Sequence, residues 1–255
     1  VHKLNTTTPG WQQEVRYQNR NDSSDGHPQY TNKILALSKI RKLGKGKLLT
    51  QVQKDRIRIG SGLDVDETGL AVGYTKPLDG MDTHAFVGIN NNKTLRDFHT
   101  TDPQIQHQEA RFRSYLGGIG VGKGFQVPGH KSFANLGLTM AFEIVDTYSE
   151  GDEYDWERES FGLWLGEFGL KKETQAFKRT LNHHLFMFTH KMTGDDKQAF
   201  SYRGTSIEHE YISQSARAIG YSMATALSDK QNLHFEVTYS DDKLWGTSLR
   251  TSFAL

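Results

Sequence analysis

Residues 232–240 read NLHFEVTYS, and apolar and polar side chains alternate through this stretch without a break. Leu233, Phe235, Val237 and Tyr239 share one side of an extended chain, and the polar residues between them share the other. Successive side chains of a β-strand point to opposite faces, so this pattern predicts a strand with one apolar and one polar face.

The same alternation recurs along the chain, whereas amphipathic helical periods are nearly absent. Further clear examples are NLGLTMAFEIV at 135–145 and LWGTSLRTSFAL at 244–255. The predicted strands lie near residues 11–20, 29–41, 47–59, 69–78, 83–91, 106–121, 133–147, 157–170, 178–192, 198–212, 215–228, 231–240 and 244–254. Because 198–228 contains no clear central turn, two of these segments can also be read as one strand, which gives twelve strands.

Short turn signals such as LDGMD at 78–82 alternate with longer polar stretches such as NRNDSSDGHP at 19–28. Tight turns on one side and longer loops on the other predict an up-and-down antiparallel meander. No repeat or linker divides the chain, so we expect residues 1–255 to form a single domain. Long strands without helices leave two architectures, a soluble sandwich or a closed barrel.

Composition excludes several classes of protein. The 255 residues include no cysteine, which excludes disulfides and thiol chemistry, and a net charge of +1 gives no sign of nucleic-acid binding. No apolar run approaches the roughly 18 residues of a membrane-spanning helix. The start at Val1 suits a processed, exported protein, although a trimmed chain would look the same.

Strand length and polarity favour a transmembrane barrel. Many predicted strands reach the roughly nine to eleven residues that cross a bilayer at a tilt. Their polar faces carry Arg, Lys, Glu and His opposite apolar faces, as expected where the outside meets lipid and the inside is wet. We therefore predict an all-β, closed, antiparallel up-and-down transmembrane β-barrel of about twelve strands.

The last strand resembles the terminal strand of bacterial outer-membrane β-barrels, because Leu249, Phe253 and Leu255 alternate and a Phe lies near the end. The layout of WQQEVRYQNRNDSSDG, QYTNKILALSKI and KGKLLTQVQK is similar to the KdgM-like family of narrow porins for acidic oligosaccharides. Autotransporter translocator domains are also similar in size and strand count, but Pro9 and Gly10 interrupt the segment where their pore-threading helix would lie. These resemblances imply an outer-membrane channel that acts as a monomer.

Basic residues at period two are the candidate selectivity residues, because residues that alternate in this way share one strand face. If that face is lumenal, they form a basic track for carboxylate-bearing sugars. The candidate track residues are Arg16, Lys33, Lys54, Arg56, Arg58, Arg111, Arg113 and Arg250. The candidate lumenal acidic partners are Glu14, Asp55, Glu109 and Glu236. The alternative is that these groups only brace one another; on strand 47–59 both faces are polar, so the pattern leaves its inward face open.

Other motifs have structural interpretations. GGIGVGKG at 117–124 lacks the hydroxyl residue and the following helix of a phosphate-binding loop, so we expect its glycines to bend a strand or to clear lumenal space. The acidic stretches 64–67 and 150–157 lack the spacing of a calcium loop. Aromatic residues are expected at the membrane interfaces. They are Trp11, Tyr17, Tyr74, Tyr115, Trp156, Trp164, Tyr221, Tyr239 and Trp245.

Histidines offer a limited case for an enzyme. His183 and His184 are adjacent in sequence, so on a strand they point to opposite faces and cannot serve one site. The Glu208-His209-Glu210 triplet belongs to no recognisable catalytic motif. The sequence therefore predicts no catalytic residue, metal or cofactor.

The resulting hypothesis is a passive outer-membrane porin for small solutes, chiefly acidic oligosaccharides, with outer-membrane lipid as its surroundings. Three alternatives stay open: a secretion barrel that exports a polypeptide or polysaccharide, an outer-membrane lipid-modifying or hydrolytic enzyme, and a soluble sugar-binding sandwich.

Overall fold

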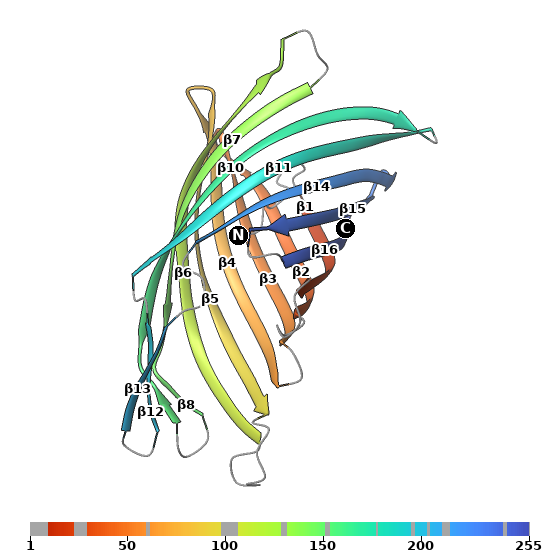
Figure 1. Ribbon diagram of the computed structural model, residues 1–255. Helices are drawn as coiled ribbons and strands as arrows, with labels where there is room; N and C mark the ends of the chain where they lie inside the picture. Colours follow the sequence, from red (N-terminus) through yellow and green to blue (C-terminus); the bar gives the residue numbers. More distant parts are fainter. Residues whose placement is uncertain are drawn as a thin grey trace.

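The computed structural model describes residues 10–22, 30–59, 62–97, 107–128, 132–150, 154–176, 178–194, 197–202, 205–210, 215–241 and 244–254. Within these residues, twelve strands close into one antiparallel barrel and four short strands form a second sheet (Figure 1). The barrel strands are β1 (Gly10–Asp22), β2 (Tyr30–Leu43), β3 (Gly46–Ile59), β4 (Leu63–Leu78), β5 (Met81–Asp97), β6 (His107–Gln126), β7 (Ser132–Val145), β10 (Glu159–Ala176), β11 (Arg179–Gly194), β14 (Ser215–Ser228), β15 (Gln231–Ser240) and β16 (Leu244–Ala254). The small sheet contains β8 (Tyr148–Glu150), β9 (Tyr154–Trp156), β12 (Lys197–Tyr202) and β13 (Thr205–Glu210).

The barrel closes where β1 pairs with β16, the first strand with the last. In this pairing Arg16 lies opposite Arg250, and every barrel strand thereby has two antiparallel neighbours. Closure leaves no sheet edge with unpaired backbone groups, which is the condition for a sheet to lie in lipid. The predicted fold class and strand number are confirmed.

Two segments differ from the predicted strands. The described residues of the predicted strand 198–212 do not add a wall strand; residues 198–202 and 205–210 lie in the paired strands β12 and β13 of the small sheet. The acidic stretch 150–157, read from the sequence as a loop, contributes β9 and the last residue of β8 to that sheet. Both hairpins interrupt the meander without changing the order of the wall strands, because β7 pairs with β10 and β11 pairs with β14.

The two faces of the wall have the polarity of a membrane barrel. On β7, the outward-facing Leu136, Leu138 and Phe142 are 59, 44 and 52% exposed, while the inward-facing Thr139 is 9% exposed. Large apolar side chains at this exposure occur on strand after strand, which in water would be a broad aggregation-prone surface. The outer face is therefore the lipid-facing one. Among the described residues, no helix is long and apolar enough to cross a bilayer.

The two ends of the barrel differ in their connections. At the end that we call the short-turn end, tight turns such as Gly44–Lys45 and Asp79–Gly80 join neighbouring strands, and Gly44, Asp79 and Gly80 adopt positive φ. β1 begins and β16 ends at this same end. The opposite end, which we call the loop end, carries the small sheet (lower part of Figure 1).

The glycines of β6 make room for aromatic side chains of β5. A Cβ at Gly118 would collide with the ring of Phe86 and the carbonyl oxygen of Met140, and one at Gly120 would collide with His84. Both glycines share the inward face with these rings. The prediction that the glycine run clears lumenal space is thus supported at these two positions, where the rings lie against bare backbone.

The small sheet packs against the inner face of the wall at the loop end. The ring of Phe112 on β6 stacks on Tyr148 at 4.3 Å, and Tyr148 stacks on Trp156 at 5.7 Å. Beneath them Glu150, which is fully buried, accepts hydrogen bonds from Arg96 Nε at 3.0 Å and from Trp156 Nε1 at 3.1 Å. Burial next to Glu150 raises the pKa of the Tyr148 phenol. Trp156 is therefore a buried anchor, and its predicted place in an interfacial girdle is wrong.

Candidate functional site: the barrel lumen

One row of paired residues shows how the strands line the lumen. Along this row His234 is paired with Arg250, Arg250 with Arg16, and Arg16 with Ile34. The row continues from Ile34 to Asp55 on β3 and then to Glu67 on β4. Residues in one row of an antiparallel sheet share a face, so ionisable groups from five of these six strands meet inside the barrel.

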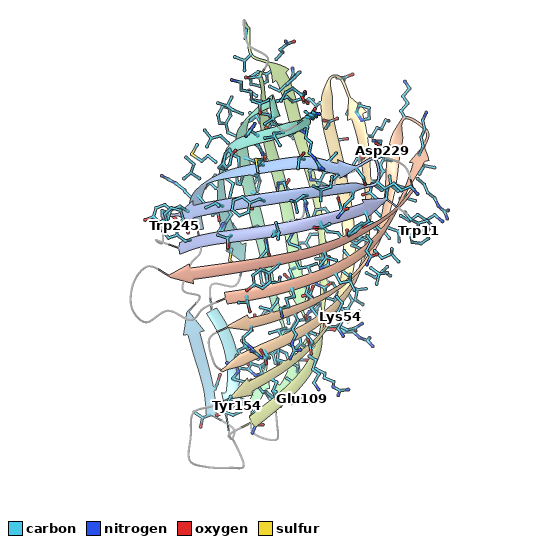
Figure 2. All side chains as sticks on the ribbon, turned by 90° about the vertical axis from the view of Figure 1, so that its right-hand side faces the viewer. Trp11, Lys54, Glu109, Tyr154, Asp229 and Trp245 are labelled. Atoms are coloured by element: carbon cyan, nitrogen blue, oxygen red, sulfur yellow. The ribbon has the colours of Figure 1, made fainter. Side chains whose placement is uncertain are left out.

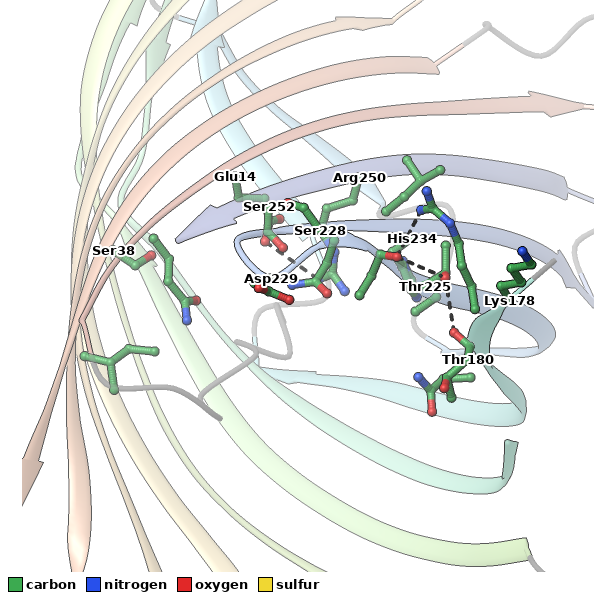
Figure 3. Close-up of a pocket in the computed structure, with 18 of the residues that line it drawn as sticks. Glu14, Ser38, Lys178, Thr180, Thr225, Ser228, Asp229, His234, Arg250 and Ser252 are labelled. Atoms are coloured by element: carbon green, nitrogen blue, oxygen red, sulfur yellow. Dashed lines mark hydrogen bonds and ion pairs between the residues drawn. The ribbon is translucent and has the colours of Figure 1, made fainter. Parts of the chain in front are cut away.

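Glu14 joins the two lumenal arginines. Its carboxylate lies 3.5 Å from Arg16 and 3.7 Å from Arg250, and side-chain exposures of 24, 13 and 16% show that all three groups are largely enclosed. Figure 3 shows Glu14 and Arg250 beside a cavity of about 440 Å³, with His234 and Ser252 on the same wall. The cavity lies at the short-turn end, since Asp229 and Lys178 of two turns also line it.

A chain of amides and carboxylates covers the inner face of β3. Ser38 Oγ donates to Gln51 Oε1 at 3.3 Å, and Gln51 Nε2 donates to Gln53 Oε1 at 2.7 Å. Gln53 Nε2 in turn donates to Asp55 Oδ2 at 3.1 Å and to Glu67 Oε1 at 3.5 Å. This wall therefore offers a continuous polar surface inside the barrel.

The opposite wall is smooth and partly apolar. Ala216, Ala218, Gly220 and Ser222 of β14 form its inward face, and all four are buried. Aromatic rings of β11 cover them: Phe186 lies where a Cβ of Gly220 would be, and the inward-facing residues Phe186 and Phe188 stack at 6.3 Å. The lumen thus has one side lined by hydrogen-bonding side chains and one side lined by small residues and aromatic rings.

The structure divides the predicted basic track. Arg16 and Arg250 face the lumen, as do the predicted acidic partners Glu14, Asp55 and Glu236. The other predicted residues lie on the outer face. They are Lys33, Lys54, Arg56, Arg58, Arg111 and Arg113, together with the predicted partner Glu109.

The error has a physical cause. Alternation shows that Arg111 and Arg113 share a face but not which face it is, and the apolar residues opposite them suggested a lipid-facing side there. Those residues, Ala110 and Phe112, face inward because the small sheet packs on that surface. A membrane barrel usually has an apolar outer face and a polar inner face. In this part of β6, at the loop end, the inner face is apolar and the outer face is charged.

Carboxylates outnumber cations among the described inward-facing residues of the membrane-spanning wall. The carboxylates are Glu14, Asp55, Glu67, Asp82, Glu143, Glu167, Glu173 and Glu236, and the cations are Arg16, Lys42, Lys47, Lys171 and Arg250. The expected basic-lined lumen is therefore corrected to a mixed lumen with an acidic excess. Glu143 and Glu167 were missed as site residues. Glu143 is the one carboxylate of β7, and Glu167 is flanked by Gly166, Phe168 and Gly169 on β10; a carboxylate among apolar residues and glycines is a readable signal of an inward position.

The histidines considered for catalysis and the acidic residues considered for calcium binding do not share one face of the wall. His183 faces outward, where its ring lies 2.6 Å from the Tyr221 hydroxyl, while His184 faces the lumen. Asp64 and Asp66 of the acidic stretch 64–67 also face outward, whereas Glu67 faces inward. The side chains of residues 207–210 and all of 151–153 lie outside the described residues.

Comparisons with known proteins identify the fold. No protein-family model matches the chain, and no curated protein matches its sequence. The translocator domain of the autotransporter NalP from Neisseria meningitidis superimposes with a TM-score of 0.64 at 12% identity, covering 99% of this chain and 91% of that one. The transport unit of the autotransporter AIDA-I from Escherichia coli gives 0.65 at 9% identity, covering 100% and 93%.

A small porin is similar to a lesser degree. The NanC porin superimposes with a TM-score of 0.50 at 11% identity, covering 95% of this chain and 100% of that chain. At these identities the likeness shows a shared fold. Together with the lipid-facing outer surface, it makes the chain a twelve-stranded β-barrel of the bacterial outer membrane.

Proposed function

We propose that the barrel is a secretion barrel, which exports a polypeptide joined to it ahead of β1. The observation that carries this proposal is the position of β1. The strand begins at the short-turn end at Gly10, and two successive inward residues close to its start, Gln12 and Glu14, line the lumenal cavity there. A segment that precedes β1 therefore joins the barrel at the lip of this cavity and has a direct route into the lumen.

The lumenal surface suits an extended polypeptide. Backbone N–H and C=O groups need partners when they leave bulk water, and the amides of Gln51 and Gln53 are such partners. The ring-covered wall opposite tolerates apolar side chains. The likeness to two autotransporter barrels, which covers nearly the whole chain, supports the same reading and favours it over the porin hypothesis.

Surface display tests this proposal. An unstructured epitope placed ahead of Gly10 is expected to react with a membrane-impermeant label on intact cells when the barrel is folded. The chain has no cysteine of its own, so a cysteine in the epitope and one replacing Gln53 can trap a segment inside the lumen. Trapping is expected to abolish labelling. A folded barrel whose epitope stays protected with or without the trap would contradict export.

A passive channel is the second candidate, supported by the polar, mixed-charge lining of the lumen. In such a channel the excess of lumenal carboxylates favours the passage of cations. A porin for acidic oligosaccharides would instead have to bind them with Arg16 and Arg250, the two residues of the predicted track that face the lumen. Planar-bilayer recording separates the two versions: a cation-selective open pore supports a general channel, and an anion-selective one supports the sugar porin. Neither candidate includes a catalytic step.

A further inference from the structure

We propose that the outer face of the β2–β6 wall binds the phosphorylated sugar headgroup of an outer-leaflet glycolipid. The binding surface, which we call the basic belt, consists of Lys33, Lys54, Arg56, Arg58, Lys93, Arg111 and Arg113. It is independent of what crosses the lumen, because these side chains point away from it.

The belt begins where the lipid-facing surface ends. One row of paired outward residues is apolar on four successive strands: Val52, Leu70, Ile89 and Tyr115. Two residues further toward the loop end, each strand becomes polar. The next row reads Lys54, Thr68, Asn91 and Arg113. A step of two residues is about 7 Å, so the first cations lie at the depth of headgroups directly above the acyl chains.

The following row concentrates the charge. Lys33 is paired with Arg56, and beyond Asp66 on β4, Lys93 is paired with Arg111. This makes two basic clusters, one on β2–β3 and one on β5–β6, on either side of β4. From β3 to β6 there are three interstrand spacings, about 14 Å. Two separated cation clusters suit a headgroup with a phosphate at each end of a disaccharide.

Carboxylates on the same surface as the basic belt form ion pairs with some of its cations. Arg58 forms a bidentate pair with Asp64, at 2.7 Å from Nε and 3.0 Å from Nη2. Lys93 lies 2.8 Å and Arg111 3.0 Å from Glu109. The remaining carboxylates are Asp66, which lies 3.9 Å from Arg56, and Asp97, which lies at the end of β5 toward the loop end. Seven cations against four carboxylates leave an excess of three positive charges on this surface.

Three cations of the basic belt form no ion pair with a carboxylate among the described residues. Within the described part of the chain, Lys33, Lys54 and Arg113 have no carboxylate in ion-pairing range, and all three are exposed. Figure 2 shows Lys54 and Glu109 on the half of the wall that leads to Tyr154 of the small sheet. The other side of the barrel lacks such a surface: Lys191 and Arg217 are the outward cations described near the loop end of β11 and β14.

Phosphate is the group that fits this arrangement. Guanidinium and ammonium groups bind phosphate oxygens by charge-assisted hydrogen bonds, and basic clusters at a membrane surface recognise anionic headgroups. Lipid supplies that phosphate because the belt adjoins the acyl-chain region, with Tyr115 beside Arg113 at the boundary.

The test uses the full chain refolded into phosphatidylcholine nanodiscs that contain diphosphorylated or monophosphorylated lipid A, with bound lipid counted by native mass spectrometry. The key variant combines Lys33→Gln, Lys54→Gln and Arg113→Gln, which removes charge without stranding a carboxylate. Each cation near a membrane surface contributes roughly fivefold, so we expect a loss of about tenfold to hundredfold in lipid A affinity. Exposed polar replacements leave folding intact, which heat-dependent gel mobility confirms.

Matched controls decide the outcome. The variant Lys191→Gln, Arg217→Gln on the opposite side is expected to bind lipid A like the wild type, as is the charge-preserving variant Lys33→Arg, Lys54→Arg, Arg113→Lys. The wild type is expected to prefer diphosphorylated over monophosphorylated lipid A. Equal losses on both sides of the barrel, no phosphate preference, or displacement of lipid A by inorganic phosphate at equal concentration would each overturn the proposal.

Discussion

The wall formed by β4–β6 and the wall formed by β14–β16 are built differently. β5 and β6 have 17 and 20 residues, whereas β15 and β16 have 10 and 11. Nearly all residues of the short strands are needed to span the membrane. The long ones continue past the lipid, where they carry the small sheet on their inner face and the basic belt on their outer face. Their additional residues therefore build a structure outside the membrane, with polarity opposite to that of the wall inside it.

The largest expected effect is the loss of that structure when the ion pair of its buried carboxylate, Glu150, is broken. In Arg96→Met, the fully buried Glu150 loses its cation, which costs about 3–5 kcal/mol in comparable buried pairs. The small sheet is expected to separate from the wall while the barrel stays closed. Hydrogen exchange should then rise sharply in β8 and β9 and stay unchanged in β15 and β16.

Arg111→Met is the matched control for this change. Arg111 lies on the outer face of the same wall, with a side-chain exposure of 75%, and does not contact the small sheet. Equal exchange in β8 and β9 for the two variants would show that the Arg96–Glu150 pair does not hold the sheet.

The next effect tests the packing of the long wall within the membrane. In Gly118→Val, the new side chain collides with the ring of Phe86 and with the carbonyl oxygen of Met140. Overpacking of this kind typically lowers the free energy of unfolding by about 1–3 kcal/mol. Urea unfolding in lipid measures it. Gly124→Val is the control on the same strand, because the Cβ of that residue meets only the Ala134 carbonyl oxygen, at 3.8 Å; similar losses at both positions would argue against the collision.

A smaller effect concerns the short wall, where Glu14 holds two arginines. In Glu14→Gln, Arg16 and Arg250 lose their shared carboxylate, so the lumen becomes less acidic. The ratio of cation to anion permeability is expected to fall by up to about fivefold at low salt, and by less at 1 M salt, because single charges in water are weak and screened. Reversal potentials in planar bilayers measure this ratio.

Glu109→Gln makes the same charge change on the outer face and is the control for the lumenal variant. Its permeability ratio is expected to equal that of the wild type. If the two variants shift the ratio equally, the lumenal position of Glu14 does not govern selectivity.

Sequence alone is sufficient for the fold because period-two alternation survives in nearly every wall strand. Residues 133–145 illustrate this: one face is apolar from Leu136 to Ile144, so both the strand and its lipid face can be read directly. Turn signals such as Asp79–Gly80 then supply the order of the meander. Closure follows, since an open edge would be unstable in lipid.

The site was less predictable because face assignment depends on long-range contacts. Lys54 and Arg56 sit on a strand with two polar faces, and only the pairing of Val52 with Leu70 identifies their face as the outer one. Arg111 and Arg113 face outward because Tyr148 packs on the other side of β6, and that contact joins residues far apart in sequence. By contrast, Glu236 is correctly placed from the sequence, because its strand is apolar on one face only.

The smallest effect is a pH dependence of the belt. Hydrogen bonds from Lys93 and Arg111 lower the pKa of the Glu109 carboxyl below its ordinary value of 4.5. A carboxyl with a depressed pKa in the folded state adds stability above that ordinary value and loses it as the pH falls through the depressed pKa. The stability difference between the wild type and Glu109→Gln should therefore be present at pH 6 and vanish at about pH 2–3. Urea unfolding at both pH values, repeated in 1 M salt to screen the exposed pairs, measures it; a difference that persists at low pH or in high salt would assign the effect to packing instead of charge.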